Sequence, residues 1–149
     1  MRTFDDLDKN ILTELSKDSS ISIPTLAQKL NSKQSVLYNR IKRLRDTGVI
    51  KKFTILVDDK VLGVGVKATI GISRNPKAKA EIHKELELTK EVDEISEVTG
   101  RFDIMVHVRA KNLEELHNIV IEKIGKINGI NDTETFIDLQ KTEKNPDFT

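Results

Sequence analysis

The sequence predicts an α+β protein, in which a three-helix unit precedes a sheet covered by two helices. Apolar residues recur at helical spacing in the first third of the chain. Later, apolar and polar residues alternate in four segments that helical patterns interrupt. We therefore expect a helix-turn-helix domain over residues 1–57, a hinge at 58–63, a ferredoxin-like βαββαβ domain over 64–141 and a polar tail at 142–149.

Three helices and one strand are predicted in the first domain, at 7–17, 23–30, 33–47 and 49–57. Aspartates precede the first helix, where negative charge is favoured. Ser22 and Ser32 are the expected N-caps of the second and third helices. Gly48 suits a left-handed C-terminal cap, and the β-prone run after it is the predicted strand.

The second domain follows the order β-α-β-β-α-β, which is that of the ferredoxin-like split unit. The pair Gly100-Arg101 predicts a two-residue type II′ hairpin between the second and third strands. Right-handed crossovers place both helices on one face of the sheet, so the other face lacks a cover within the chain. Met105 lies beside Ile104 and Val106, and these apolar residues on both faces favour pairing with another subunit.

Basic residues are concentrated in one segment of a chain whose net charge is only +1. Residues 28–52 contain eight basic side chains and one acid, so this segment carries +7. Solvated helix faces usually mix both signs, whereas a local basic block is typical of a phosphate-binding surface. In a helix-turn-helix, the second helix of the motif enters the major groove of double-stranded DNA.

The candidate DNA-binding residues lie on the third helix and just after it. They are Lys33, Gln34, Ser35, Tyr38, Asn39, Arg40, Lys42, Arg43, Arg45, Lys51 and Lys52. Gln and Asn side chains read adenine through two hydrogen bonds, while the arginines are expected to hold phosphates. The alternative interpretation is a three-helix interaction domain in which these residues are ordinary helix surface.

Other classes of protein find little support in the composition. The chain has no cysteine, so disulfides and thiolate metal sites are excluded. Absence of a long apolar run or a secretory signal leads us to expect a cytoplasmic protein without a membrane partner. His83, His107 and His117 lie on different predicted elements without a metal-binding spacing. We expect neither an enzyme nor a metal or cofactor site.

The sequence resembles the Lrp/AsnC family of regulators, also called feast/famine regulatory proteins. The N-terminal match runs from Leu7-Asp8 through Ile11-Leu12, Leu15, Ile21-Ser22, Leu26-Ala27, Ser32 and Arg40-Ile41-Lys42-Arg43-Leu44 to Gly48-Val49-Ile50. The C-terminal match comprises Leu62-Gly63, Val98-Thr99-Gly100-Arg101-Phe102-Asp103, Gly129-Ile130 and Thr133-Glu134-Thr135. The two halves match independently and in the same order, over residues 5–141.

The resemblance implies a winged helix-turn-helix, all-α with a small β wing, and a domain that senses amino acids. It also implies homodimers that pair through the C-terminal sheet and assemble into tetramers or octamers. The effector-binding residues that it implies are Thr99, Gly100, Arg101, Phe102, Asp103, Thr133 and Thr135. Asp103 is expected to bind the ammonium group of an amino acid. Backbone N–H groups of the Gly100 turn are expected to bind the carboxylate of the same amino acid.

The expected function is therefore sequence-specific transcription regulation that responds to a small effector, an amino acid. Two alternatives stay open at this point. Gly100 is equally explained by the needs of a hairpin, and Asp103 by a solvated turn. An architectural DNA-binding protein would share the helix-turn-helix and the oligomer and lack only the effector site.

Overall fold

The computed structural model describes residues 4–149, and their contacts divide them into two units. The first unit comprises the described residues through Leu56 together with Thr142–Thr149. The second is Val57–Lys141. The tail at 142–149, expected as a separate segment, thus joins the first unit, because it makes hydrogen bonds to that unit's first helix. No helix among these residues is long and apolar enough to span a bilayer.

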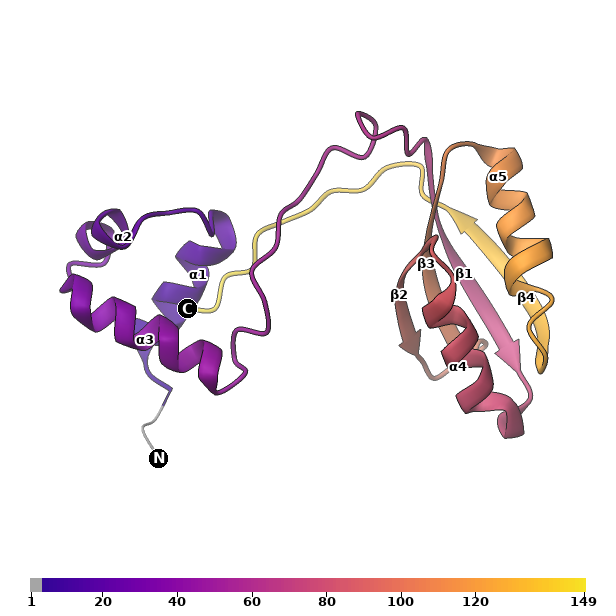
Figure 1. Ribbon diagram of the computed structural model, residues 1–149, viewed down its shortest axis with the longest axis horizontal. Helices are drawn as coiled ribbons and strands as arrows, with labels where there is room; N and C mark the ends of the chain where they lie inside the picture. The colour runs from indigo at the N-terminus through magenta and orange to yellow at the C-terminus, as the bar shows by residue number, and fades with distance from the viewer. Residues whose placement is uncertain (1–3) are drawn as a thin grey trace. The chain divides into compact units, whose positions relative to one another are not determined.

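Three helices form the first unit: α1 (Asp6–Lys17), α2 (Ile23–Lys29) and α3 (Gln34–Asp46) (Figure 1). They coincide with the predicted helices to within one residue at each end. Asp5 caps α1 in a capping box with Asp8, since each side chain accepts a hydrogen bond from the other's backbone N–H. Ser22 caps α2, as predicted, by accepting a hydrogen bond from the Thr25 N–H at 3.2 Å.

The predicted capping role of Ser32 is wrong. The Ser32 N–H bonds to the Ala27 carbonyl at 3.0 Å, after Asn31 turns the chain with φ of 47°. Asparagine tolerates this left-handed conformation better than most residues do. As a result α3 begins one residue later than expected, and its N-cap residue is Lys33. The Lys33 side chain makes no capping hydrogen bond.

The predicted strand at 49–57 is also absent from the part of the chain that the structure describes. The Ile50 N–H bonds to the Leu44 carbonyl and closes the end of α3. Beyond it Ile55 and Leu56 are 81% and 79% exposed. A β-strand needs a partner for its ladder, and the first unit offers none among its described residues. High β-propensity alone therefore leaves this segment extended and unpaired.

The second unit has the predicted order of strands and helices. Its elements are β1 (Val66–Arg74), a 3₁₀ turn (Pro76–Ala78), α4 (Lys79–Leu88), β2 (Val92–Glu97), β3 (Ile104–Ala110), α5 (Leu113–Asn118), its continuation as a π-helix (Ile119–Ile124) and β4 (Ile130–Ile137). The strands pair in the order β2-β3-β1-β4, and every pair is antiparallel. This is the ferredoxin-like topology expected from the sequence.

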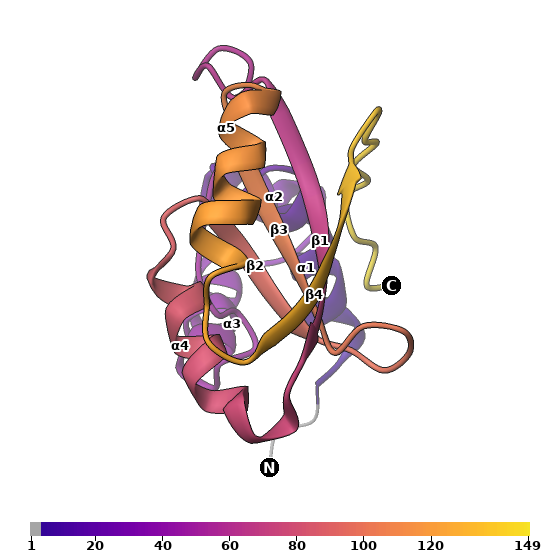
Figure 2. The ribbon, with the colours of Figure 1, turned by 90° about the vertical axis from the view of Figure 1, so that its right-hand side faces the viewer.

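Both helices of the second unit cover one face of the sheet (Figure 2). Ile82 and Leu86 of α4 and Leu116 of α5 pack in one core with the inward residues of the central strands, such as Ile70 and Val106. Each of these side chains is buried. The opposite face, called the open face below, carries the alternate residues of β1 and β3 and has no covering element among residues 57–141.

The connection between β2 and β3 is longer than the predicted two-residue hairpin. The last ladder pair is Glu97 with Ile104, and the Val98 N–H then bonds to the Asp103 carbonyl at 3.0 Å. Four residues, 99–102, span the turn. Gly100 has a φ of 127°, a conformation that favours glycine. The turn therefore needs a glycine at this position, although it is not the type II′ turn that the sequence predicted.

Candidate DNA-binding surface and effector site

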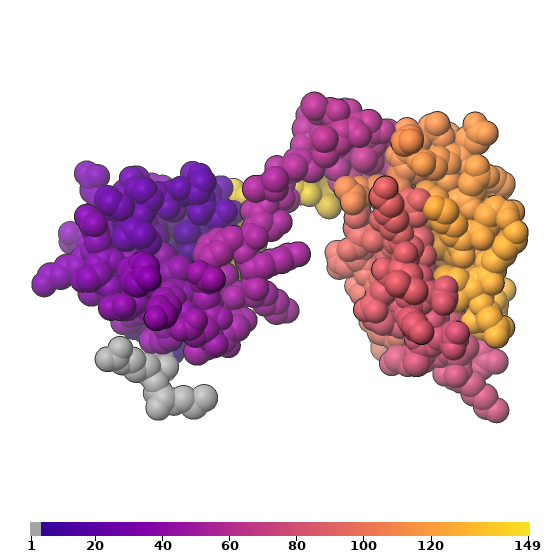
Figure 3. All heavy atoms as spheres, in the orientation of Figure 1, coloured from indigo at the N-terminus to yellow at the C-terminus, as the bar shows by residue number. Residues whose placement is uncertain are grey.

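The third helix has one buried side and one exposed side. Leu37 and Leu44 are buried against Ile11 and Leu26 of the other helices. The opposite side exposes most of the predicted recognition residues: Lys33, Gln34, Ser35, Tyr38, Asn39, Lys42 and Arg45. In the space-filling view the α3 segment lies at the surface of the first unit (Figure 3). The helix is thus free to present amide, hydroxyl and cationic groups together.

Arg40 and Arg43 are oriented differently from these residues. Arg40 Nη1 donates to Asp5 Oδ2 at 2.6 Å and to Asp8 Oδ1 at 3.1 Å, and Arg43 Nη2 donates to Asp8 Oδ2. The Asp8 carboxylate is fully buried between the two guanidinium groups. A buried carboxylate is tolerated only when it is paired and hydrogen-bonded, so these arginines join α1 to α3. Sequence reasoning assigned them to phosphates and missed this role.

The charges in this network support one another. A hydrogen bond from Arg40, followed by one from the Asp8 backbone, holds the pKa of Asp5 below its ordinary value of 3.8. The hydrogen bond that Arg40 donates to Asp5 also raises the pKa of Arg40. Asp5 and Arg40 therefore both remain ionised at neutral pH.

Three further cations predicted to contact DNA lie in the last turn of α3 and just beyond it. The Arg45 guanidinium lies 5.9 Å from the centre of the Phe53 ring, which holds it by a cation–π contact. Lys51 and Lys52 are exposed on the extended segment that follows. Arg45, in the last turn of α3, and the two lysines beyond the helix carry positive charge at positions suited to a flanking phosphate backbone.

In the second unit, Asp103 holds the β2–β3 turn against the adjacent strand. Its backbone N–H donates to the Ile72 carbonyl at 2.9 Å, and its Oδ2 accepts from the Arg74 N–H, also at 2.9 Å. Asp103 is thus a structural anchor as well as a predicted effector ligand.

Arg101 and Phe102 lie together over the open face. The Phe102 ring packs on Gly71 of β1, and it meets Phe136 of β4 edge to face at 6.1 Å. The Arg101 guanidinium lies 5.0 Å from the Phe102 ring centre and pairs with Glu134. This arrangement places a cation, an anion and an aromatic surface side by side.

Thr133 and Thr135 are not part of that group. They pair across the sheet with Ile72 and Ile70, whose side chains point into the core under the helices. Directly opposed residues of antiparallel strands share a face, so both threonines point away from the open face. The structure therefore separates the predicted effector residues into two sets. The intervening Glu134 lies with Arg101 and Phe102.

Sequence reasoning missed three charged residues around the turn: Glu134, Arg74 and Glu97. Arg74 Nη2 donates to Glu97 Oε2 at 3.2 Å, and Lys79 lies 3.4 Å from the same oxygen. Burial opposes ionisation of Glu97, but the hydrogen bond from Arg74 and the charge of Lys79 outweigh it and lower its pKa. The strand alternation around Thr133 and Thr135 was the available signal for Glu134. Arg74 and Glu97 gave none, because only the fold brings them together.

The histidines do not gather into a site. His83 lies 3.3 Å from Glu87 on the surface of α4, and His107 Nδ1 lies 3.1 Å from the Thr69 hydroxyl on the open face. Among residues 4–149, no group of three or more His, Asp and Glu side chains is arranged to hold a metal ion.

A helix-turn-helix joined to a ferredoxin-like domain is the architecture of a class of transcriptional regulators. Family models agree with both halves. Residues 4–51 match a winged helix-turn-helix DNA-binding model, and residues 67–147 match the Lrp/AsnC ligand binding domain. The chain belongs to the Lrp/AsnC family, and it is a regulator and not an enzyme.

Characterised relatives and solved structures agree with this assignment. The HTH-type transcriptional regulator FL11 of Pyrococcus furiosus is 38% identical over 136 residues, which cover 91% of this chain and 89% of the relative. Escherichia coli AsnC superposes with a TM-score of 0.87 at 29% identity, covering 95% and 96% of the two chains. A Neisseria meningitidis transcriptional regulator in complex with L-Met has the same fold, with a TM-score of 0.92 at 19% identity and coverage of 99% and 97%.

Proposed function

We propose that this protein binds specific sequences of double-stranded DNA through α3 and that an amino acid regulates its assembly or its DNA binding. The exposed side of α3 is the observation that carries the proposal. Gln34 and Asn39 supply paired donors and acceptors suited to adenine, and Lys33 and Lys42 supply charge for phosphates. A helix packed on both sides would have contradicted the proposal.

Binding to DNA is tested by measuring affinity for duplexes at several salt concentrations. Gln34→Ala and Asn39→Ala are expected to reduce the preference for specific over random sequence, because they remove base contacts. Lys42→Ala is expected to weaken binding to specific and to random DNA equally. It should also reduce the slope of log affinity against log salt concentration by about 1. Equal losses on specific and random DNA for all three variants would contradict this recognition face.

The effector proposal rests on the polar cluster over the open face. A zwitterion needs an anion for its ammonium group and donors for its carboxylate. Asp103 and Glu134 offer the anion, while Arg101 and the backbone of the Gly100 turn offer the donors. Phe102 offers an apolar wall. The complex of the N. meningitidis relative with L-Met supports an amino acid as the ligand class.

Thermal unfolding with each of twenty amino acids at millimolar concentration tests this proposal. A ligand that binds only the folded protein raises the melting temperature, by an amount that grows with its concentration. Arg101→Ala is expected to abolish that increase. If none of the amino acids raises the melting temperature, the architectural DNA-binding alternative is favoured.

Self-association through the open face is the third part of the proposal. Phe102, Met105 and Phe136 are apolar residues on a face that lacks a cover among residues 57–141. Pairing of two such faces would remove them from water. A tetramer or octamer built from these dimers is the assembly that we expect.

A further inference from the structure

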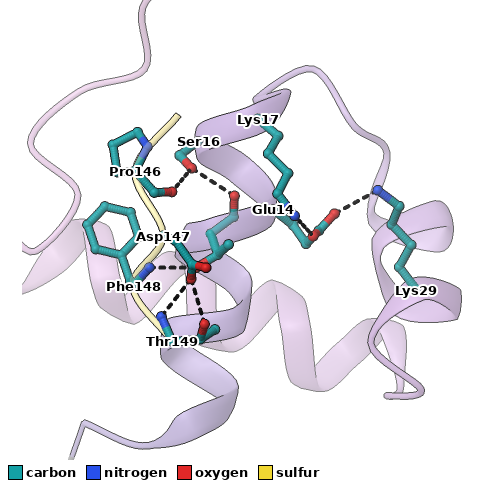
Figure 4. A network of polar contacts seen from close by, with 9 residues as sticks. Glu14, Ser16, Lys17, Lys29, Pro146, Asp147, Phe148 and Thr149 are labelled. Carbon is teal, nitrogen blue, oxygen red and sulfur yellow. Dashed lines mark hydrogen bonds and ion pairs between the residues drawn. The ribbon is translucent and has the colours of Figure 1, made fainter. Parts of the chain in front are cut away.

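The last eight residues return to the first unit and bind α1 (Figure 4). The Ser16 hydroxyl donates to the Pro146 carbonyl at 2.8 Å, and it lies at the same distance from the Thr13 carbonyl of its own helix. The Phe148 N–H donates to the Thr13 Oγ1 at 2.9 Å. Thr13 is only 6% exposed while the segment is bound, so its hydroxyl has the Phe148 N–H as a partner in a place that water barely reaches.

The end of the segment has a defined conformation of its own. Asp147 Oδ1 accepts hydrogen bonds from the Thr149 N–H at 3.0 Å and from the Thr149 hydroxyl at 2.5 Å. These bonds, with a smaller contribution from the nearby charge of Lys17, lower the pKa of Asp147. The carboxylate therefore both folds the segment's end and faces a cation of α1.

Strand pairing in the second unit determines where the chain leaves the sheet toward this segment. β1 and β4 are neighbouring antiparallel strands, with Ala68 opposite Ile137. The Asp138 N–H continues the pairing by donating to the Lys67 carbonyl at 2.9 Å. The start of β1 and the end of β4 therefore lie at the same end of the sheet. Both connections to the first unit, one through residues 57–65 and the other through residues 138–141, leave from there.

We propose that residues 142–149 form a strap that docks on α1 and provides a second connection between the DNA-binding unit and the ligand-binding domain. A unit held by one linker reorients freely, whereas two connections from adjacent strands restrict the orientations that it samples. Through residues 138–141 the strap also links α1 to β4, the strand that carries Glu134. Its docking requires neither DNA nor an effector, so it is independent of the proposed function.

A single-tryptophan protein tests the docking, because the chain contains no tryptophan. Phe148, which is 45% exposed, is changed by Phe148→Trp in the 149-residue protein. Acrylamide quenching of its fluorescence is expected to be at least about twofold weaker than in a free peptide of residues 142–149 with the same substitution. Ser16→Ala and Thr13→Val, introduced separately, are expected to raise quenching toward the peptide value.

The matched control is Ser19→Ala, which removes an exposed serine hydroxyl just beyond α1 and is expected to leave quenching unchanged. Far-UV circular dichroism verifies that each variant is folded. Ser16 is on the helix surface, so Ser16→Ala remains informative if Thr13→Val fails to fold.

Hydrogen exchange measured by mass spectrometry supplies a second test without any substitution. The Phe148 amide in the intact protein is expected to exchange about tenfold more slowly than in the free peptide, because it is hydrogen-bonded. Exchange at the peptide rate, peptide-like quenching of the tryptophan in the parent protein, or unchanged quenching in Ser16→Ala would overturn the proposal.

Discussion

Arg43 and Lys42 are neighbours on α3 that have different roles. Arg43 pairs with the buried carboxylate of Asp8, whereas Lys42 is exposed. Arg43→Ala is expected to lower the free energy of unfolding by about 1.5–3 kcal/mol, because it removes a charged hydrogen bond from a buried acid. Lys42→Ala is expected to change it by less than about 0.5 kcal/mol. Urea unfolding followed by circular dichroism measures both values.

The comparison also separates stability from DNA affinity. Lys42→Ala is expected to weaken DNA binding without loss of stability. The main expected effect of Arg43→Ala is a lower free energy of unfolding. If Arg43→Ala proved as stable as Lys42→Ala, the inferred joint between α1 and α3 would be wrong.

Acid is expected to destabilise the first unit partly through Asp5. Its pKa in the folded protein lies below 3.8, because Arg40 and the Asp8 N–H bond to the ionised form. The unfolded chain then binds a proton more readily than the folded one. The stabilisation is complete above the unfolded pKa and is lost as the pH falls through the folded pKa.

Melting temperatures of the parent and Asp5→Asn proteins, measured between about pH 5 and pH 3, test this contribution. The parent curve is expected to fall more steeply below the ordinary pKa of 3.8. Parallel curves would show that Asp5 makes no such contribution. Glu14 and Asp18, whose pKa values are also lowered, remain in both proteins and serve as an internal reference.

At the scale of elements, the close packing of β1 against the β2–β3 turn decides where Phe102 lies. A Cβ atom at Gly71 would come within 2.5 Å of the Phe102 ring. Gly71→Ala is therefore expected to displace the ring and to cost about 1–3 kcal/mol, as overpacking does. It should also reduce any stabilisation by an amino-acid effector. Denaturant titration with and without ligand provides both measurements.

A second substitution distinguishes this clash from other effects of the alanine. Phe102→Leu shortens the side chain that the new methyl group would meet. The double variant Gly71→Ala with Phe102→Leu is expected to lose less stability than the sum of the two single variants. Simple additivity would mean that the ring is not the obstacle.

At the scale of the whole molecule, the open face is the expected dimer interface. Met105 lies on that face opposite Gly71, while Ile121 is 47% exposed on the helical side of the domain. Met105→Glu is expected to reduce the mass in solution toward that of one chain, 16.9 kDa, because pairing would bury a charge. Sedimentation equilibrium measures the mass. Ile121→Glu is the control, expected to keep the parent mass, and an unchanged mass for Met105→Glu would exclude this face.

Local patterns in the sequence determined the order of elements in both units. Helical periodicity located α1, α2 and α3 almost to the residue, and alternation located the four strands. The basic face of α3 was also predictable, because exposure follows from helical spacing once the buried leucines are known. The family resemblance then predicted a transcription regulator, and the two family models and the relative FL11 confirmed this prediction.

Only the tertiary structure decided which charged groups meet. Asp8 and Arg43 are 35 residues apart, and the strap and α1 lie near opposite ends of the chain. Tertiary structure also decided which segments form strands, because residues 49–57 have strand propensity but lack a partner strand in the described chain. Propensity and spacing act over a few residues, whereas ion pairs, ladders and docking depend on segments that the fold brings together. That difference in range is why the sequence determined the elements and the fold determined the site.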